Sequence, residues 1–161
     1  MTNATENSLP VAIREMTADD LDAVLTLERQ IFTDDWSRQA FQEALDDDTW
    51  GLLLAEHGGD MIGYACYVII DIKAHLTNIA VEPTHRRKSV AKALLDRILQ
   101  TVTQRNCEYI LLEVRPSNQA AIAFYEKHGF EKGHQRPGYY RNAVEDALVM
   151  VRHLARYEQE D

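Results

Sequence analysis

Hydrophobic and polar positions follow a helical period in four parts of the chain, two of them near the N-terminus. From Ala18 to Phe32 apolar side chains recur every three or four residues, which predicts an amphipathic helix. Thr17 and Asp20 match the capping-box pattern that opens such a helix, with Asp in the place of Glu. A second, shorter helix is predicted to begin after Ser37, a suitable cap, and to continue through Leu45.

The other two helices are predicted in the second half of the chain. A strongly amphipathic segment begins near Val90, with Leu94 and Ile98 on its buried face. Asn118 is a suitable cap for the last helix, and Gly129 is typical of the residue just beyond a helix C-terminus.

Between these helices the pattern changes to runs of β-forming residues bounded by turns, which predicts strands. The segment His57–Asp60 contains two glycines and predicts the tight turn of a hairpin. Strands are expected at Val11–Met16, Trp50–Glu56, Met61–Ile70, Ala74–Val81, Tyr109–Val114, Phe130–Gln135 and Ala143–Arg152. Because strands and helices are intermixed along the chain, the predicted class is α/β (α+β), with a mixed central sheet of about seven strands flanked by about four helices.

Composition adds the expected domain organisation. The 161 residues, 45% hydrophobic and 27% charged, suffice for a single domain, which we expect over residues 11–154. Residues 1–10 are expected to form a disordered leader and residues 155–161 a flexible acidic tail. No apolar run approaches the ~20 residues of a membrane helix, and no signal-peptide pattern is present, so no membrane partner is expected.

Charge and cysteine content narrow the possible partners. The formal net charge of −9 disfavours direct binding of nucleic acid. Such a charge favours a cationic partner, or it merely keeps the chain in solution. Cys66 and Cys107 have neither disulfide-framework nor metal-ligand spacing, so we expect two core cysteines, no metal and a cytoplasmic location.

The segment Asn78–Lys92 contains the strongest candidate for chemistry. A strand runs into a short loop and then into a helix, whose first N–H groups and dipole favour an anion. Arg86, Arg87 and Lys88 gather positive charge in that loop, and small residues follow them. These features predict a pyrophosphate site, although a solvated turn with a few charges has the same pattern.

The pattern Arg86-x-x-Ser89-x-Ala91 resembles the acyl-CoA-binding motif of GNAT-type acetyltransferases, and the resemblance extends from Ile13 to about Leu154. Its nearest form is the RimI type, the ribosomal-protein alanine N-acetyltransferases. The stretches that resemble it, in order, are Phe32-x-x-x-Trp36-Ser37, Asn78-Ile79-Ala80-Val81-x-Pro83, Leu112-Glu113-Val114-Arg115-x-Ser117-Asn118, Ala123-x-Tyr125-Glu126-x-x-Gly129-Phe130, Tyr139-Tyr140 and Glu145-Asp146-Ala147.

This resemblance implies a GNAT fold and acetyl-CoA as co-substrate. It implies cofactor contacts at Ile79, Ala80, Val81, Arg87, Lys88, Ser89, Val90, Ala91, Lys92 and Asn118. The family usually has glycine at the position of Ser89. Serine keeps the backbone N–H, but its Cβ disfavours a positive φ and can crowd the phosphate, so we expect binding to survive with some loss.

Acetyl transfer to an amine requires a neutral amine and a protonated leaving thiolate. Deprotonation at pH 7 costs roughly 1–1.4 kcal/mol for a protein N-terminus and about 4.6 kcal/mol for a lysine, so a modest base serves an N-terminus. The resemblance implies Glu113 as proton acceptor and Tyr125 as proton donor, with direct attack in a ternary complex. Without the resemblance, the residues themselves favour plainer roles: Glu113 pairs with Arg115 on a wet strand face, Tyr125 packs in the core, and Asn118 acts as a cap.

Aromatic residues on loops are the candidates for the acceptor groove. The resemblance implies this role for Trp36, Tyr139 and Tyr140, although Asp35 and Arg141 replace the usual prolines beside them. Exposed carboxylates near Trp36, at Asp34, Asp35 and Asp46–Asp48, either attract a cationic peptide or form a solvated face.

The predicted activity is acetylation of a protein N-terminus, first of all the N-terminal alanine of a small-subunit ribosomal protein. A small-molecule amine acetyltransferase on the same fold is the alternative, since function depends on the site and not on the fold. A non-catalytic acyl-CoA-binding module is a third possibility, which the presence of both Glu113 and Tyr125 disfavours.

Overall fold

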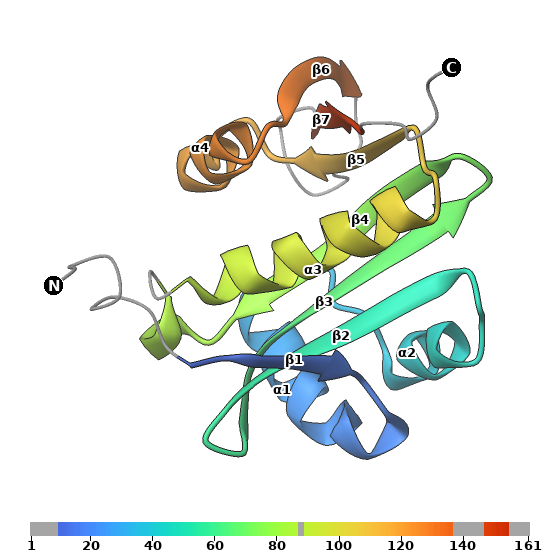
Figure 1. The fold of residues 1–161 in the computed structure, drawn as a ribbon. Coiled ribbons are helices and arrows are strands. Elements are labelled where there is room, and N and C mark those ends of the chain that lie inside the picture. Colours follow the sequence, from blue (N-terminus) through green and yellow to red (C-terminus); the bar gives the residue numbers. More distant parts are fainter. Residues whose placement is uncertain (1–9, 87–88, 137–146, 155–161) are drawn as a thin grey trace, which may run out of the picture. The chain divides into compact units, whose positions relative to one another are not determined.

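The computed structural model describes residues 10–86, 89–136 and 147–154 of the chain (Figure 1). The predicted order of strands and helices is confirmed throughout these residues. The α-helices are α1 (Leu21–Ile31), α2 (Arg38–Leu45), α3 (Val90–Gln104) and α4 (Gln119–Lys127). The strands are β1 (Ala12–Glu15), β2 (Trp50–His57), β3 (Asp60–Ile70), β4 (Lys73–Val81), β5 (Tyr109–Val114), β6 (Glu131–Arg136) and β7 (Ala147–His153).

The strands form one mixed sheet of seven strands, as the sequence predicts, and their order in the sheet is β1-β2-β3-β4-β5-β7-β6. Strands β4 and β5 pair in parallel, whereas β1 with β2, β2 with β3, β5 with β7, and β6 with β7 pair antiparallel. The chain divides into two compact units, residues 1–68 with 78–101, and residues 69–77 with 102–161.

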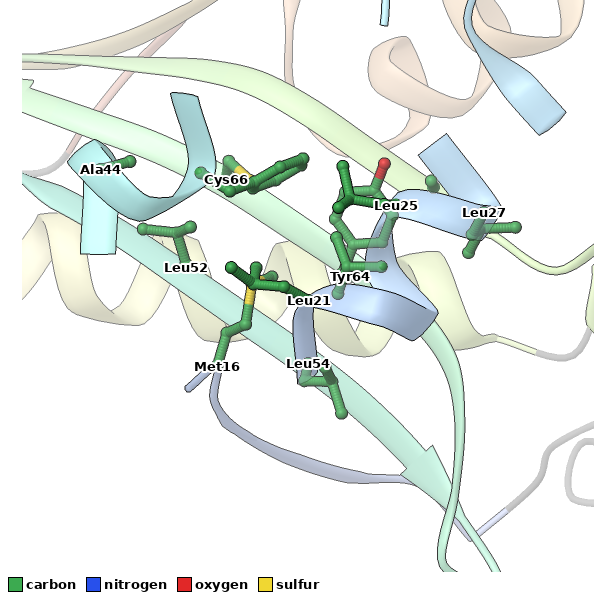
Figure 2. Close-up of a cluster of buried hydrophobic side chains, with 12 residues drawn as sticks. Met16, Leu21, Leu25, Leu27, Ala44, Leu52, Leu54, Tyr64 and Cys66 are labelled. Atoms are coloured by element: carbon green, nitrogen blue, oxygen red, sulfur yellow. The ribbon is translucent and has the colours of Figure 1, made fainter. Parts of the chain in front are cut away.

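In the first unit, helices α1 and α2 pack on β2 and β3 around one apolar cluster, part of which Figure 2 shows. Successive strand residues point to opposite faces, so Tyr64 contributes to this cluster while its neighbour Gly63 faces α3 at Val90. The buried residues of the cluster are Met16, Leu21, Val24, Leu25, Leu27, Phe41, Ala44, Leu52, Leu54, Tyr64, Cys66 and Ala80.

In the second unit, β5 lies between β4 and β7, and α4 follows β5 directly. The register pairs Tyr109 with His153 and Val114 with Leu148, and Ile110, Leu112 and Met150 are buried. Helix α4 ends before Gly129, whose φ of 91° is the left-handed conformation that glycine adopts readily.

Local signals in the sequence correspond to contacts in the structure. The Thr17 N–H donates to Asp20 Oδ2 at 2.8 Å, and the Ala40 N–H donates to Ser37 Oγ at 3.1 Å. One detail differs, because the predicted first helix opens with a 3₁₀ turn at Ala18–Asp20, and α1 proper begins at Leu21. Such 3₁₀ turns are common at helix ends.

The remaining sequence predictions have mixed outcomes. Both cysteines are buried free thiols as expected, and burial raises the pKa of each, with the charge of Glu28 adding to the effect at Cys66. In the described part of the chain, no helix has the length and apolar composition needed to cross a membrane. Most of the expected leader and all of the expected tail lie outside the described residues, and the single domain over residues 11–154 stays a prediction.

Candidate active site

The predicted cofactor strand is the last part of β4, and its residues are held tightly in the first unit. Ala80 and Val81 are buried, and the Glu82 N–H donates to the Ile62 carbonyl at 2.9 Å, which continues the pairing of the chain with β3. A 3₁₀ turn at Pro83–His85 follows, and then Arg86, whose Nε donates to the Val81 carbonyl at 3.2 Å. The Arg86 side chain therefore ties the loop back to the end of the strand.

Ser89 has a left-handed backbone conformation, which the glycine usual in the family adopts readily. Its φ is 67°, in the left-handed region, and its carbonyl accepts the first helical hydrogen bond of α3 from the Ala93 N–H at 3.1 Å. A serine in this conformation costs about 1 kcal/mol or more relative to glycine. Arg87 and Lys88 lie outside the described residues, so their predicted contacts are not located.

In the first turn of α3, backbone N–H groups are better placed than side chains to bind an anion. Val90 is buried, Ala91 is half-buried, and Lys92 Nζ lies 2.7 Å from Asp96 Oδ2 one turn further along the helix. Since the first N–H groups of a helix have no partner within it, an anion at this end would meet N–H donors and the positive end of the dipole. The described residues of the loop thus suit a pyrophosphate.

Glu113 lies in β5 of the second unit, opposite Val149 of β7. Its side chain is 5% exposed, and its Oε1 lies 3.6 Å from His75 Nε2. The Glu113 carboxylate therefore lies largely out of solvent and beside an imidazole.

Sequence reasoning missed His75. The parallel register places His75 of β4 opposite Leu111, two residues before Glu113, so alternation puts His75 and Glu113 on one face of the sheet. The sequence contains the histidine in a predicted strand, but the register that brings it to the carboxylate is set only by the pairing of β4 with β5.

Tyr125 and Asn118 occupy α4 and its cap. The Tyr125 ring is buried and meets Phe124 and Phe130 with ring centroids 5.2 and 5.5 Å apart, so the expected core packing is present. Burial raises the pKa of the Tyr125 hydroxyl, which keeps its proton in place over the working pH range. The Asn118 side chain accepts the Ala121 N–H at 3.2 Å, which confirms its capping role.

Trp36 is half-buried in the connection between α1 and α2. Its ring packs at 5.0 Å from Phe41 and 5.3 Å from Trp50, measured between ring centroids. The neighbouring Asp34 and Asp35 are exposed, as is Asp46–Asp48 after α2, and Asp35 lies 3.9 Å from Arg29. Tyr139, Tyr140 and Arg141 fall outside the described residues.

The first unit also has a cleft of ≈ 480 Å³, and none of the residues that line it is a predicted site residue. Helix α1, the β2–β3 turn and the segment after β4 line it, including Gln30, His57, Asp60, Glu82 and His85. Within the described residues no group of three metal-binding side chains is found.

The fourth strand of this mixed seven-stranded sheet runs into a short loop and then into helix α3, as the sequence motifs predict. The chain belongs to the acetyltransferase (GNAT) family, whose model matches residues 21–130, and it is an enzyme of that class. This confirms the family and fold that the sequence motifs predict.

Relatives of this chain include enzymes of the predicted type. The [ribosomal protein bS18]-alanine N-acetyltransferase of Escherichia coli (strain K12) is 32% identical over 141 residues, which cover 86% of this chain and 95% of that protein. An N-alpha-acetyltransferase of Saccharolobus solfataricus is 32% identical over 155 residues, covering 88% and 92%. The crystal structure of the E. coli ribosomal-protein-S18-alanine N-acetyltransferase superposes with a TM-score of 0.84 at 29% identity, covering 94% of this chain and 98% of that one.

Proposed function

We propose that this enzyme transfers an acetyl group from acetyl-CoA to the N-terminal alanine of ribosomal protein bS18. The observation that carries the proposal is the 32% identity to the E. coli enzyme of that name over nearly its whole length. The α-amino group is also the easier acceptor, because its low pKa makes the neutral amine accessible to a single carboxylate base. We also propose that the enzyme acts in the cytoplasm, where ribosomal proteins are made.

The cofactor is proposed to lie along the end of β4 and at the start of α3. Backbone groups of Ile79–Val81 would pair with the pantetheine amides in the manner of an added strand, and Ser89–Lys92 would meet the pyrophosphate at the helix N-terminus. Arg87, Lys88 and Asn118 are proposed to complete the contacts. Bound acetyl-CoA supplies the activated thioester carbonyl.

Glu113 and Tyr125 are proposed to carry the protons of the reaction. Glu113 accepts a proton of the amine, directly or through one water, as the nitrogen attacks the thioester carbonyl carbon. The C–S bond breaks, and the Tyr125 hydroxyl donates its proton to the departing sulfur. Backbone N–H groups of Ile79–Val81 stabilise the negative charge that develops on the carbonyl oxygen. His75 Nε2 lies 3.6 Å from Glu113 Oε1 and is therefore the imidazole beside the proposed base.

The acceptor peptide is proposed to bind beside Trp36, Tyr139 and Tyr140. Aromatic side chains provide large, rigid contact area for a peptide, and the exposed carboxylates of Asp34 and Asp35 favour a positively charged acceptor.

The test is acetylation of a peptide panel read by mass spectrometry. Peptides that begin with the alanine of bS18, or with Ser, Gly or Met in its place, compete with polyamines and aminoglycosides for acetyl-CoA. We expect the alanine peptide to be acetylated at its N-terminus with the highest kcat/KM. Acetylation of the small amines alone would replace this proposal with the small-molecule alternative.

The catalytic roles have their own test in Glu113→Gln and Tyr125→Phe. Each variant is expected to lower kcat on the alanine peptide by about 10²-fold or more at pH 7, because general acid–base catalysis contributes that much. Tyr125→Phe keeps the ring that packs on Phe130, so its melting temperature should stay close to that of the wild type. Unchanged kcat in both variants would show that neither Glu113 nor Tyr125 moves a proton in the reaction. A wild type that binds acetyl-CoA but acetylates none of the amines would support a role without catalysis.

A further inference from the structure

Glu28 is a fully buried carboxylate that the proposed mechanism does not use. It lies in α1 with no exposed surface, in a helix that buries Leu21, Val24, Leu25 and Leu27. Burial of a charged carboxylate is costly unless hydrogen-bond donors surround it. At this position Glu28 makes hydrogen bonds that an apolar residue in the same helical stripe could not make.

Three donors from three different parts of the first unit converge on this carboxylate. The Trp36 backbone N–H donates to Oε2 at 2.8 Å. The Tyr64 hydroxyl of β3 donates to Oε1, and Asn78 Nδ2 of β4 donates to the same oxygen at 3.3 Å. Burial, reinforced by the hydrogen bond to Glu28, raises the pKa of Tyr64, so the phenol remains the donor.

The contact with Trp36 fixes a segment that is otherwise open to solvent. Residues 33–35 between α1 and Trp36 are exposed, and the peptide N–H of Trp36 is held by the Glu28 carboxylate. The Trp36 indole packs on Phe41 and Trp50, so these two rings and the Glu28 contact together hold the residue in place.

The contact with Asn78 ties the same carboxylate to the strand of the proposed cofactor site. Asn78 directly precedes Ile79–Val81 in β4 and is 5% exposed. Its other amide atom, Oδ1, is buried without a hydrogen-bond partner in the described protein. The carboxylate of Glu28 is therefore a single point at which the α1–α2 loop and the proposed cofactor strand are joined.

We infer that Glu28 is a positioning residue for the acceptor: it holds the loop that contains Trp36 in one place relative to the β4 segment that begins at Asn78. This inference rests on the proposed function, because it assumes that Trp36 borders the acceptor. When only a fraction of molecules has the loop in place, the apparent KM for the acceptor rises by the inverse of that fraction, while kcat is kept.

The test compares Glu28→Leu, Glu28→Gln and Tyr64→Phe in the full-length enzyme. Leucine has a similar size but accepts no hydrogen bond, so the Trp36 amide should exchange with deuterium at least tenfold faster, and the KM for the alanine peptide should rise at least tenfold. The KM for acetyl-CoA and kcat should change less than threefold.

Glu28→Gln is the conservative rescue. Its amide oxygen can accept the Trp36 N–H, while its NH₂ group can donate to Asn78 Oδ1 once that amide turns over. The rate of deuterium exchange at the Trp36 amide and the KM for the acceptor peptide should therefore stay within about threefold of the wild-type values. Tyr64→Phe removes one donor to Glu28 but leaves the Trp36 contact, so it should alter thermal stability and not the acceptor KM.

Two results would overturn the inference. One is Glu28→Leu with unchanged exchange at Trp36 and unchanged acceptor KM. The other is an equal rise of acceptor KM in Tyr64→Phe, which would make Glu28 only part of the core. Should the leucine variant not fold, Glu28→Asp decides, because its shorter carboxylate should also speed exchange at Trp36. Hydrogen exchange is measured without an acceptor peptide. It therefore tests the contact between Glu28 and the Trp36 N–H even if the alanine peptide is not a substrate and the proposed function has failed.

Discussion

At the scale of single residues, Ser89 has a backbone conformation that its own side chain disfavours. With φ at 67°, replacement by glycine removes a steric cost of about 1 kcal/mol. We predict that Ser89→Gly raises the free energy of unfolding by about 0.5–1 kcal/mol in urea titrations. It should also tighten acetyl-CoA binding severalfold in calorimetry, because a Cβ no longer crowds the loop.

Asn106 is the matched control for this prediction. It has a φ of 62° outside the loop, and asparagine tolerates this conformation better than serine does, so Asn106→Gly should relieve a smaller strain and leave acetyl-CoA binding unchanged. Weaker binding by Ser89→Gly would show instead that the serine hydroxyl contacts the cofactor.

Asp20 determines part of the stability of the first unit at acid pH. The hydrogen bond from the Arg14 guanidinium at 2.8–2.9 Å, helped by the Thr17 N–H, lowers the pKa of Asp20 to about 2. A carboxylate whose pKa is lower in the folded state stabilises the fold above the unfolded pKa near 4, and this stabilisation is lost as the pH falls toward 2.

Asp20→Asn should therefore destabilise the protein by about 1 kcal/mol at pH 7, a figure reduced because Arg14 is partly exposed. The difference in free energy of unfolding between variant and wild type should shrink between pH 4 and pH 2. Titration of both proteins by circular dichroism measures it, and a difference independent of pH would contradict the assignment.

At the scale of elements, Gly63 allows β3 to pass close to the proposed cofactor strand. A Cβ at this position would lie 2.8 Å from the Ala80 carbonyl oxygen and 3.5 Å from Val81 Cα, both backbone atoms that cannot turn aside. We predict that Gly63→Ala lowers stability by about 1–3 kcal/mol and weakens acetyl-CoA binding, because the end of β4 must move.

Gly59→Ala serves as the control for Gly63→Ala. Its added Cβ would meet nothing within 4 Å, but its φ of 87° makes alanine strained, so the melting temperature should fall while cofactor affinity stays. Normal acetyl-CoA affinity in Gly63→Ala would show that the close approach does not position the strand.

The elements themselves were predictable because their signals are local. The caps at Asp20, Ser37 and Asn118 each involve residues at most three positions apart, so the sequence contains both partners. The strand segments also match in order, and the β2–β3 hairpin forms at the predicted glycines with φ of 62° and 87°. The 3₁₀ turn before α1 was not predictable, since its residues suit either helix.

At the scale of the whole molecule, the charge of −9 gives the proposed acceptor binding a dependence on salt. Exposed carboxylates at Asp34 and Asp35 beside Trp36 should attract a basic peptide, and salt screens such attraction within about 10 Å at 0.1 M. We predict that the KM of a bS18 peptide with basic residues rises with ionic strength.

Asp34→Asn should raise that KM about two- to fivefold at low salt and reduce its dependence on salt. Asp19→Asn is the control, because it makes the same change of net charge at an exposed site before α1. If both variants raised the KM equally, the attraction of the basic peptide would come from the total charge of the protein and not from Asp34 in particular.

The sequence by itself determined the order of elements, the mixed sheet, the family and the identity of the candidate residues, because periodicity, caps and motifs involve residues close in the chain. The tertiary structure alone decided which side chains meet across elements. The β4–β5 register brings His75 to Glu113, and burial of α1 joins Glu28 to Trp36 and Asn78. The partners of Glu28 lie 8 to 50 positions away in the chain, and register and packing between such segments depend on the assembled core.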